Sequence, residues 1–156
     1  MRLTLRFSFY CEEDLQQMIA VRARSLGWGI NEECLKGIAT RSRGTPRIGF
    51  NILQTARYVC RSDGSDTVLP AHLSKACELT GIDSHGLNVS TDLAYMRLLQ
   101  DSDKPLNVLA SSLGLPSRTV STVIEPYLIR SGLIAKTKCG RTLTAKGREH
   151  LLGGEK

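Results

Sequence analysis

Residues 109–134 read LASSLGLPSRTVSTVIEPYLIRSGLI, and they set the architecture of the C-terminal half. Apolar residues recur at helical spacing up to Gly114, a residue type suited to the turn that follows a helix. A second, longer apolar pattern begins after the cap-like Ser117, and Pro126 should kink or interrupt it because proline has no backbone N–H. The stretch therefore predicts a helix-turn-helix.

The segments on either side of this stretch complete a larger motif. A helical pattern covers residues 90–100, with Ser90 or Thr91 as its expected cap. After the helix-turn-helix, residues 133–137 (LIAKT) predict a strand, and KCG predicts a tight turn. Residues 141–152 (RTLTAKGREHLL) predict a second strand and a short helix. Helices followed by a two-stranded hairpin, the wing, are the order of elements in a winged helix.

Cationic and hydroxyl side chains gather on this motif. Lys136 and Lys138 should share one face of the first wing strand, because side chains repeat every two residues. Ser117, Thr119 and Ser121 lie near the start of the second helix, and their hydroxyls favour phosphate and sugar contacts over base reading. The cations that we expect to bind DNA are Arg118, Lys136, Lys138, Arg141 and Lys146. A winged helix used only for protein contacts is the alternative.

The N-terminal half carries four helical patterns. The first covers residues 11–27, and Asn31 caps the second. The third starts at Thr45 and Pro46, a good N-cap followed by a proline at the first helical position, and the fourth follows Pro70. Together they predict a compact helical bundle over residues 10–82, and the whole chain is expected to be mainly α.

The ends of this bundle mark the remaining organisation of the chain. Residues 1–9 (MRLTLRFSF) alternate polar and apolar side chains, which predicts a half-buried strand. Residues 82–88 (IDSHGLN) are the best candidate for a linker. The predicted domains are therefore a strand over 1–9, the helical bundle over 10–82, and the winged helix over 83–156.

Charge is distributed unevenly over the 156 residues. The net charge is +6 and the pI is about 9.3. Lysine and arginine outnumber the acids in residues 1–61 and 118–148, whereas residues 62–103 are acidic. Two basic blocks indicate two surfaces that face anions, although solubility alone would also account for them.

Several classes of function are disfavoured by what the sequence lacks. It contains no phosphate-binding G-x-x-x-x-G-K-S/T loop and no recognisable triad, so no catalytic residue is predicted. The five cysteines include no C-x-x-C pair, which disfavours a metal site. Cys34, Cys60 and Cys77 fall at apolar positions of helical patterns, which predicts that they are small buried hydrophobes. No signal peptide and no apolar run of about 18 residues occurs, so we expect a cytoplasmic protein without a membrane segment.

One further motif, RSRGTPRI at residues 41–48, places three arginines beside a helix start. With EPYLI at 125–129, it carries a resemblance to a known family. The chain resembles the C-terminal part of RuvB-type Holliday-junction branch-migration motors, which are AAA+ ATPases. IATRSRGTPRI is similar to the family's sensor-2 motif, FSFYCEEDLQQMI to the segment leaving the large ATPase subdomain, and VIEPYLIRSGLIAKTKCGRTLTAKG to its recognition helix and wing.

The resemblance implies a fold, a function and site residues. The fold would be a four-helix AAA+ lid followed by a winged helix-turn-helix domain with a small β-hairpin wing. Arg47 would reach the γ-phosphate of ATP, Tyr10 would lie at the adenine end, and Pro46 would line the same wall. Lys136 and Arg141 fall where the family's wing has arginines that bind DNA. The function would be ATP-dependent branch migration of four-way junctions in homologous recombination and DNA repair, with RuvA-like and RuvC-like proteins and other motor subunits as partners.

The sequence also departs from the family's pattern. The wing reads KTKCGR where the family has R-T-P-R-G-R, so Cys139 takes an arginine position. The phosphate-binding subdomain is missing, so this chain alone should bind no ATP or Mg²⁺ and have no ATPase activity. Two alternatives remain: an adaptor that docks on AAA+ motor subunits without DNA, and a winged-helix transcription regulator. The lid-like half with GTPR argues against the second.

Overall fold

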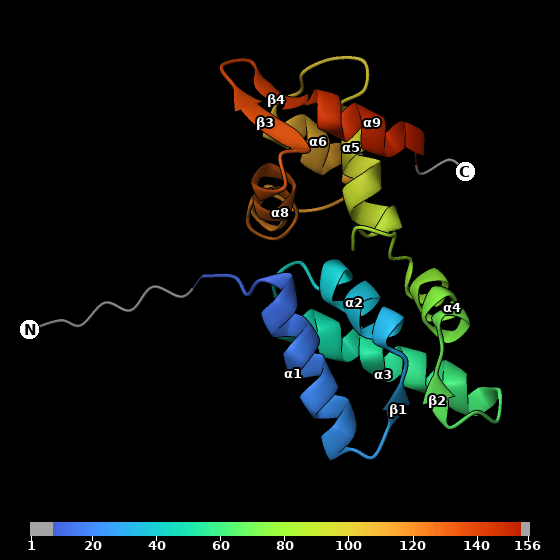
Figure 1. Cartoon of the computed structure of the whole chain (residues 1–156). Coiled ribbons are helices and arrows are strands. Elements are labelled where there is room, and N and C mark those ends of the chain that lie inside the picture. The colour runs from blue at the N-terminus through green and yellow to red at the C-terminus, as the bar shows by residue number, and fades with distance from the viewer. Residues whose placement is uncertain (1–7, 154–156) are drawn as a thin grey trace, which may run out of the picture. The chain divides into compact units, whose positions relative to one another are not determined.

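The computed structural model describes residues 8–153, and the chain divides into two compact units, Met1–Gly86 and Leu87–Lys156 (Figure 1). Each unit has its own hydrophobic core. The division lies within the predicted linker, residues 82–88. The strand predicted over residues 1–9 lies outside the described residues except for its last two positions, which have no regular structure. Among residues 8–153, no helix is both long and apolar enough to cross a membrane.

The first unit is a bundle of four helices, as the sequence predicts (Figure 1). They are α1 (Glu12–Ser25), α2 (Glu32–Arg41), α3 (Pro46–Ser62) and α4 (Pro70–Thr80). The Asn31 side chain accepts a hydrogen bond from the Glu33 backbone N–H at 2.8 Å, which confirms it as the cap of α2. Pro46 and Pro70 begin their helices because the first helical N–H needs no partner within the helix.

A short parallel pairing in this unit was not predicted. Strand β1 (Gly29–Ile30) pairs with β2 (Thr67–Val68), and each has two residues. A strand of two residues shows no alternation, so the sequence contains no signal for it. The pairing ties the loop after α1 to the loop before α4.

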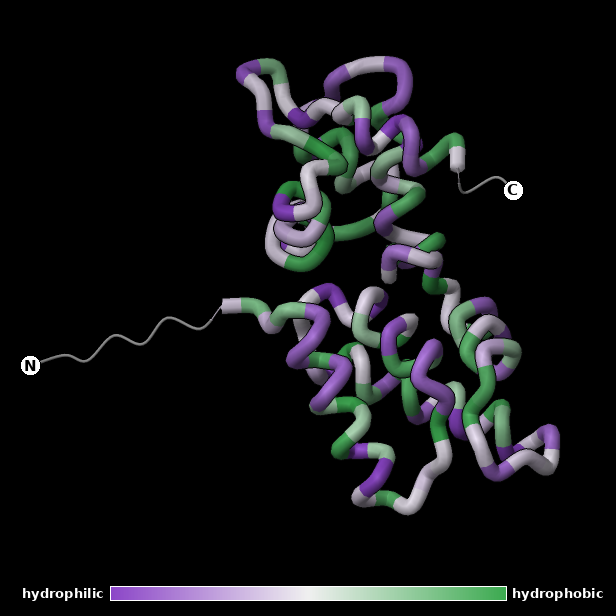
Figure 2. The backbone as a smooth tube through the Cα atoms, viewed as in Figure 1, coloured by the Kyte–Doolittle hydropathy of each residue, from purple (hydrophilic) through white to green (hydrophobic). Residues whose placement is uncertain are grey.

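The core of the first unit is aliphatic, with cysteines filling small sites. Leu15, Ile19, Ile38 and Leu53 are almost fully buried. Three of the five free cysteines, at positions 34, 60 and 77, are also buried, which confirms their predicted role as small hydrophobes. In Figure 2, hydrophobic and hydrophilic residues follow one another along the helices, as expected for helices with one face in a core.

The second unit is a winged helix. Its elements are η1 (Val89–Leu93), α5 (Ala94–Leu98), α6 (Leu106–Leu113), α7 (Ser117–Thr119), η2 (Val120–Ile124), α8 (Glu125–Arg130), β3 (Ile134–Thr137), β4 (Gly140–Leu143) and α9 (Ala145–Gly153). The predicted cap at Ser90 or Thr91 is wrong. Asn88 caps η1 instead, because its side-chain oxygen accepts from the backbone N–H groups of both of those residues.

The wing has a third strand-like partner that the sequence did not indicate. Arg141 of β4 pairs with Lys104 through two backbone hydrogen bonds, of 2.9 and 3.1 Å. Gly140 lies beside this bridge with a φ of 143°. A Cβ atom there would lie 2.4 Å from the carbonyl oxygen of Lys104. Glycine is required at this position by the close approach of two backbones as well as by the turn.

Replacing Gly140 by alanine should therefore destabilise the second unit by about 3 kcal/mol, because backbone would have to move. Gly132 provides the matched control: its φ is also positive, at 72°, but open space surrounds its Cβ position. Gly132→Ala should cost only about 1 kcal/mol. Urea unfolding followed by circular dichroism would measure both, and equal losses would contradict the packing argument.

Candidate nucleic-acid interface

Residues 117–130 form the recognition helix, which consists of α7, η2 and α8 in succession. Pro126 was predicted to kink or interrupt it, and the helix widens there into a π-turn. The N–H of Glu125 donates to the carbonyl of Val120, five residues earlier. Proline cannot donate to the carbonyl four residues before it, so a wider turn preceding Pro126 lets the chain remain helical.

The exposed start of the recognition helix carries one cation and several hydroxyls. Arg118 is exposed. Ser121 and Thr122 donate their hydroxyls to the backbone carbonyl of Arg118, at 3.0 and 2.7 Å. The Ser121 hydroxyl was predicted to favour phosphate contacts, but its hydrogen is already used inside the helix. Arg118 is therefore the stronger candidate for a phosphate contact at this site.

The wing presents two exposed lysines in different settings. Strand β3 ends at Thr137, which pairs with Gly140, so Lys138 lies in the turn. The strand does end at Thr137, as predicted, but the prediction that Lys136 and Lys138 share a strand face is wrong, because Lys138 belongs to the turn. Lys136 remains in the strand opposite Arg141, and both lysines are exposed.

A buried carboxylate lies behind these cations. Glu125 is fully buried, and its Oε1 accepts from Arg141 Nε at 2.7 Å and from the Tyr95 hydroxyl at 2.9 Å. Its Oε2 accepts from Arg141 Nη2 at 3.2 Å and lies 3.6 Å from Lys136 Nζ. The Arg141 side chain is only 17% exposed, whereas Lys136 is 57% exposed. The geometry therefore makes Arg141 a partner of Glu125 and leaves Lys136 accessible.

The contacts around Glu125 shift the pKa values of Glu125, Tyr95 and Arg141. Burial acts to raise the pKa of Glu125, but hydrogen bonds from Arg141 and Tyr95, with the charges of Arg141 and Lys136, outweigh it and lower the pKa. Burial and the nearby carboxylate raise the pKa of Tyr95. The hydrogen bond to Glu125 raises the pKa of Arg141. The carboxylate and guanidinium are thus both charged at neutral pH.

The remaining predicted DNA contact, Lys146, lies at the start of α9. Its Nζ donates to the backbone carbonyl of Ser131 at 2.9 Å, yet the residue is exposed. All five predicted cations thus belong to the second unit. Arg141 is hydrogen-bonded to the buried Glu125, and Lys136 lies 3.6 Å from the same carboxylate. Sequence reasoning missed Glu125, although a sole acid in the basic block 118–148 was a usable signal.

In the first unit, the GTPR motif opens helix α3. Arg47 is exposed on its first turn, and Pro46 is the first helical residue. The Tyr10 backbone N–H donates to the carbonyl of Gly44 at 3.1 Å, so the segment before α1 is attached to this motif. The Tyr10 side chain is 49% exposed. Tyr10 is thus attached by its backbone to the loop that leads into Pro46 and Arg47.

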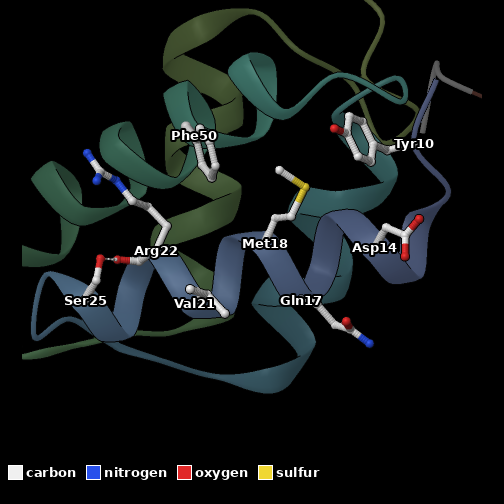
Figure 3. A pocket seen from close by; sticks show the side chains of 8 residues that line it. All are labelled: Tyr10, Asp14, Gln17, Met18, Val21, Arg22, Ser25 and Phe50. Atoms are coloured by element: carbon white, nitrogen blue, oxygen red, sulfur yellow. Dashed lines mark hydrogen bonds between the residues drawn. The ribbon is translucent and has the colours of Figure 1, made fainter. Parts of the chain in front are cut away.

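An open hollow of about 890 Å³ lies beside this region. Figure 3 shows Tyr10, Met18 and Val21 around it, with Phe50 of α3 on the opposite side. Arg47 and Pro46 are not among the residues that line it. The hollow thus has a mixed lining: Asp14, Gln17, Arg22 and Ser25 contribute polar groups beside the apolar side chains, and Arg47 lies outside it.

The fold and these sites define a class of protein, a helical AAA lid followed by a winged helix. Family models agree with both halves: the RuvB AAA lid domain matches residues 10–83 and the RuvB C-terminal winged helix domain matches residues 84–152. The chain belongs to the RuvB family. This confirms the resemblance, the fold class and the C-terminal position of the chain within the family's sequence.

Individual relatives give the extent of the similarity. The Holliday junction branch migration complex subunit RuvB of Kosmotoga olearia is 36% identical over 153 residues, which are 96% of this chain and 44% of that protein. The same subunit of Bifidobacterium adolescentis is 35% identical, over 95% of this chain and 42% of the relative. The Thermotoga maritima RuvB Holliday junction branch migration motor superposes with a TM-score of 0.85 at 32% identity, over 94% of this chain and 50% of that one. The chain thus spans less than half the length of the Kosmotoga and Bifidobacterium relatives and half of the Thermotoga chain.

The lowered pKa of Glu125 makes a prediction about acid stability. The carboxylate stabilises the folded state fully above its unfolded pKa of about 4.3, and this stabilisation is lost as pH falls through the lower folded pKa. Glu125→Gln should therefore be less stable than the parent chain at pH 7, and the difference should shrink as pH approaches about 3.

Urea unfolding at a series of pH values would measure this difference. Glu149→Gln is the matched control, because it removes an exposed carboxylate from the same unit. Its unfolding free energy should follow that of the parent chain at every pH. A Glu125→Gln difference that stayed constant with pH would contradict the assignment.

Proposed function

We propose that this chain is the lid and DNA-binding part of a RuvB-type motor, and that its winged helix binds the duplex arms of a four-way junction. The observation that carries the proposal is the placement of exposed Lys136 and Lys138 on a wing next to a recognition helix that begins with exposed Arg118. Each phosphate that a cation neutralises releases counterions, so three exposed cations give appreciable, salt-dependent affinity.

The type of contact follows from the side chains. Lysines and one arginine at a helix start favour the phosphate backbone, which carries no sequence information. Contacts to the DNA phosphate backbone suit a protein that acts on DNA of any sequence. Branch migration in recombination and repair requires this independence of sequence. The curated relatives carry the name Holliday junction branch migration complex subunit, which supports the same substrate. We assign Arg141 to the support of the wing, because its guanidinium is bound to Glu125.

We further propose that the lid faces a nucleotide, ATP with Mg²⁺, held mainly by other parts of a whole motor. Arg47, exposed at the start of a helix, suits a phosphate, and the half-exposed Tyr10 ring suits a base, with Pro46 beside it. RuvA-like and RuvC-like proteins and other motor subunits are the proposed partners. The adaptor alternative leaves the exposed wing cations without a ligand, and a transcription regulator leaves the lid unit without a role.

Binding to DNA can be tested by fluorescence anisotropy with a labelled four-way junction and a labelled duplex, between about 50 and 200 mM salt. Replacing both Lys136 and Lys138 by alanine should weaken binding and reduce the salt slope by about 2, one for each lost phosphate contact. Lys75→Ala is the control, since this exposed lysine pairs with Glu78 in the first unit. Unchanged affinity and slope in the double variant would show that the DNA surface lies elsewhere.

Calorimetry with ATP and Mg²⁺ tests the nucleotide proposal. A hydrogen bond to a charged group contributes about 1.5–3 kcal/mol. Micromolar binding needs about 8 kcal/mol. This chain should therefore show no saturable binding at micromolar ATP, and Arg47→Ala should give the same result. Micromolar saturation that Arg47→Ala abolished would mean that the lid holds the phosphates by itself.

A further inference from the structure

Glu125 has no obvious place in a DNA-binding surface. It is the only acidic residue in the basic block 118–148. A carboxylate close to DNA phosphates repels them and so opposes their attraction to nearby cations. Its side chain is fully buried, and burying a charge is costly unless the charge is paired. The contacts that Glu125 makes therefore need an explanation in terms of what they hold together.

The carboxylate joins several elements that are separate along the chain. Glu125 begins α8 of the recognition helix. Its two oxygens accept two hydrogen bonds from Arg141 of β4, at 2.7 and 3.2 Å, which is a bidentate pair with a defined orientation. The Tyr95 hydroxyl of α5 completes the coordination at 2.9 Å. The recognition helix, the wing and α5 thus meet at one side chain.

Other contacts of the wing lead to a different part of the unit. The backbone of Arg141 pairs with Lys104, and the Thr137 hydroxyl donates to Asp103 at 3.0 Å. Both contacts attach the hairpin to the segment before α6. The bidentate bond to Glu125, by contrast, connects the hairpin to the helix that carries Arg118.

Lys136 and Arg141 differ in how tightly they are held. Arg141 is mostly buried and bonded at hydrogen-bond distance, whereas Lys136 lies 3.6 Å from the carboxylate and is 57% exposed. The Lys136 ammonium can therefore turn to a phosphate while Arg141 stays in place. The carboxylate directs one cation inward as a support and leaves the other available.

We infer that Glu125 is a positioning residue for the DNA interface: through Arg141 it holds the wing against the recognition helix, so that Lys136, Lys138 and Arg118 can contact the same DNA. The inference rests on the proposed DNA binding. Electrostatics alone would predict that loss of the Glu125 charge strengthens DNA binding, and the inference predicts the opposite. Removing this negative charge should weaken binding, because the cations lose their shared geometry.

Glu125→Gln separates the two expectations. The change removes one negative charge beside the wing, so electrostatics alone predicts tighter binding to a labelled duplex. If Glu125 positions the wing, the variant should bind the duplex about tenfold more weakly than the parent chain. Glu149→Gln is the matched control, because it removes the same charge from α9, and it should bind as tightly as the parent chain or more tightly. Circular dichroism would establish that each variant is folded at the temperature of measurement.

Arg141→Lys provides a second variant in case Glu125→Gln does not fold. It keeps the net charge and loses the two-point bond, since a lysine ammonium cannot reproduce the planar fork of arginine. Positioning predicts weaker binding for Arg141→Lys as well. Parent-like affinity for Arg141→Lys, or tighter binding for Glu125→Gln, would overturn the inference.

A measurement without DNA tests the wing itself. Cys139 lies in the exposed turn of the hairpin and can carry a fluorescent label in a Cys11→Ser background, since the other three cysteines are buried. Faster and wider motion of the label in Glu125→Gln and Arg141→Lys, but not in Glu149→Gln, would support positioning, and equal motion in all would overturn it. Absence of DNA binding by the parent chain would instead refute the proposed function and leave this result intact.

Discussion

The arrangement of the second unit depends on the hydrogen bonds that Arg141 and Tyr95 donate to the buried carboxylate of Glu125. A charged carboxylate without hydrogen-bond partners is unfavourable in a protein interior. Two hydrogen bonds from Arg141 and one from Tyr95 therefore compensate for the burial of Glu125. Those bonds connect the recognition helix, the wing and α5. A pair of this kind contributes more to a defined geometry than to net stability, because desolvation offsets much of its attraction. The proposed DNA-binding surface depends on such a defined geometry.

The two units carry separate basic surfaces along one chain. The first has a separate aliphatic core and presents Arg47 and Tyr10 from one region at the start of α3. The second has its own core and presents lysines on a hairpin. The uneven charge of the sequence reflects this division, since each basic block falls mainly in a different unit. Under the proposed function, both surfaces would serve one motor, the first facing a nucleotide and the second facing DNA.

Much of the fold could be predicted because local rules govern it. Asn31 caps α2 and Pro46 begins α3, as their side-chain chemistry requires. The helix-turn-helix and the hairpin could also be predicted, from the helical spacing of apolar residues and from the turn glycines Gly114 and Gly140. The errors were local as well: Asn88 displaced the expected cap, and Lys138 lies in the hairpin turn and not on the strand face that Lys136 occupies. Each of these alternatives differs by one to three residues, which pattern reading does not resolve.

The sequence by itself determined the helices, the order of the winged helix, the family resemblance and the residues that can carry positive charge. These depend on spacing and on contacts between near neighbours. Only the tertiary structure decided which cations are exposed and which are held by an acid. Arg141 and Lys136 look equivalent on adjacent strands, yet one is bonded to an acid 16 residues away while the other remains exposed. The reason is physical: a buried carboxylate must find partners, and the packing of helix against hairpin determines which cation lies at hydrogen-bond distance.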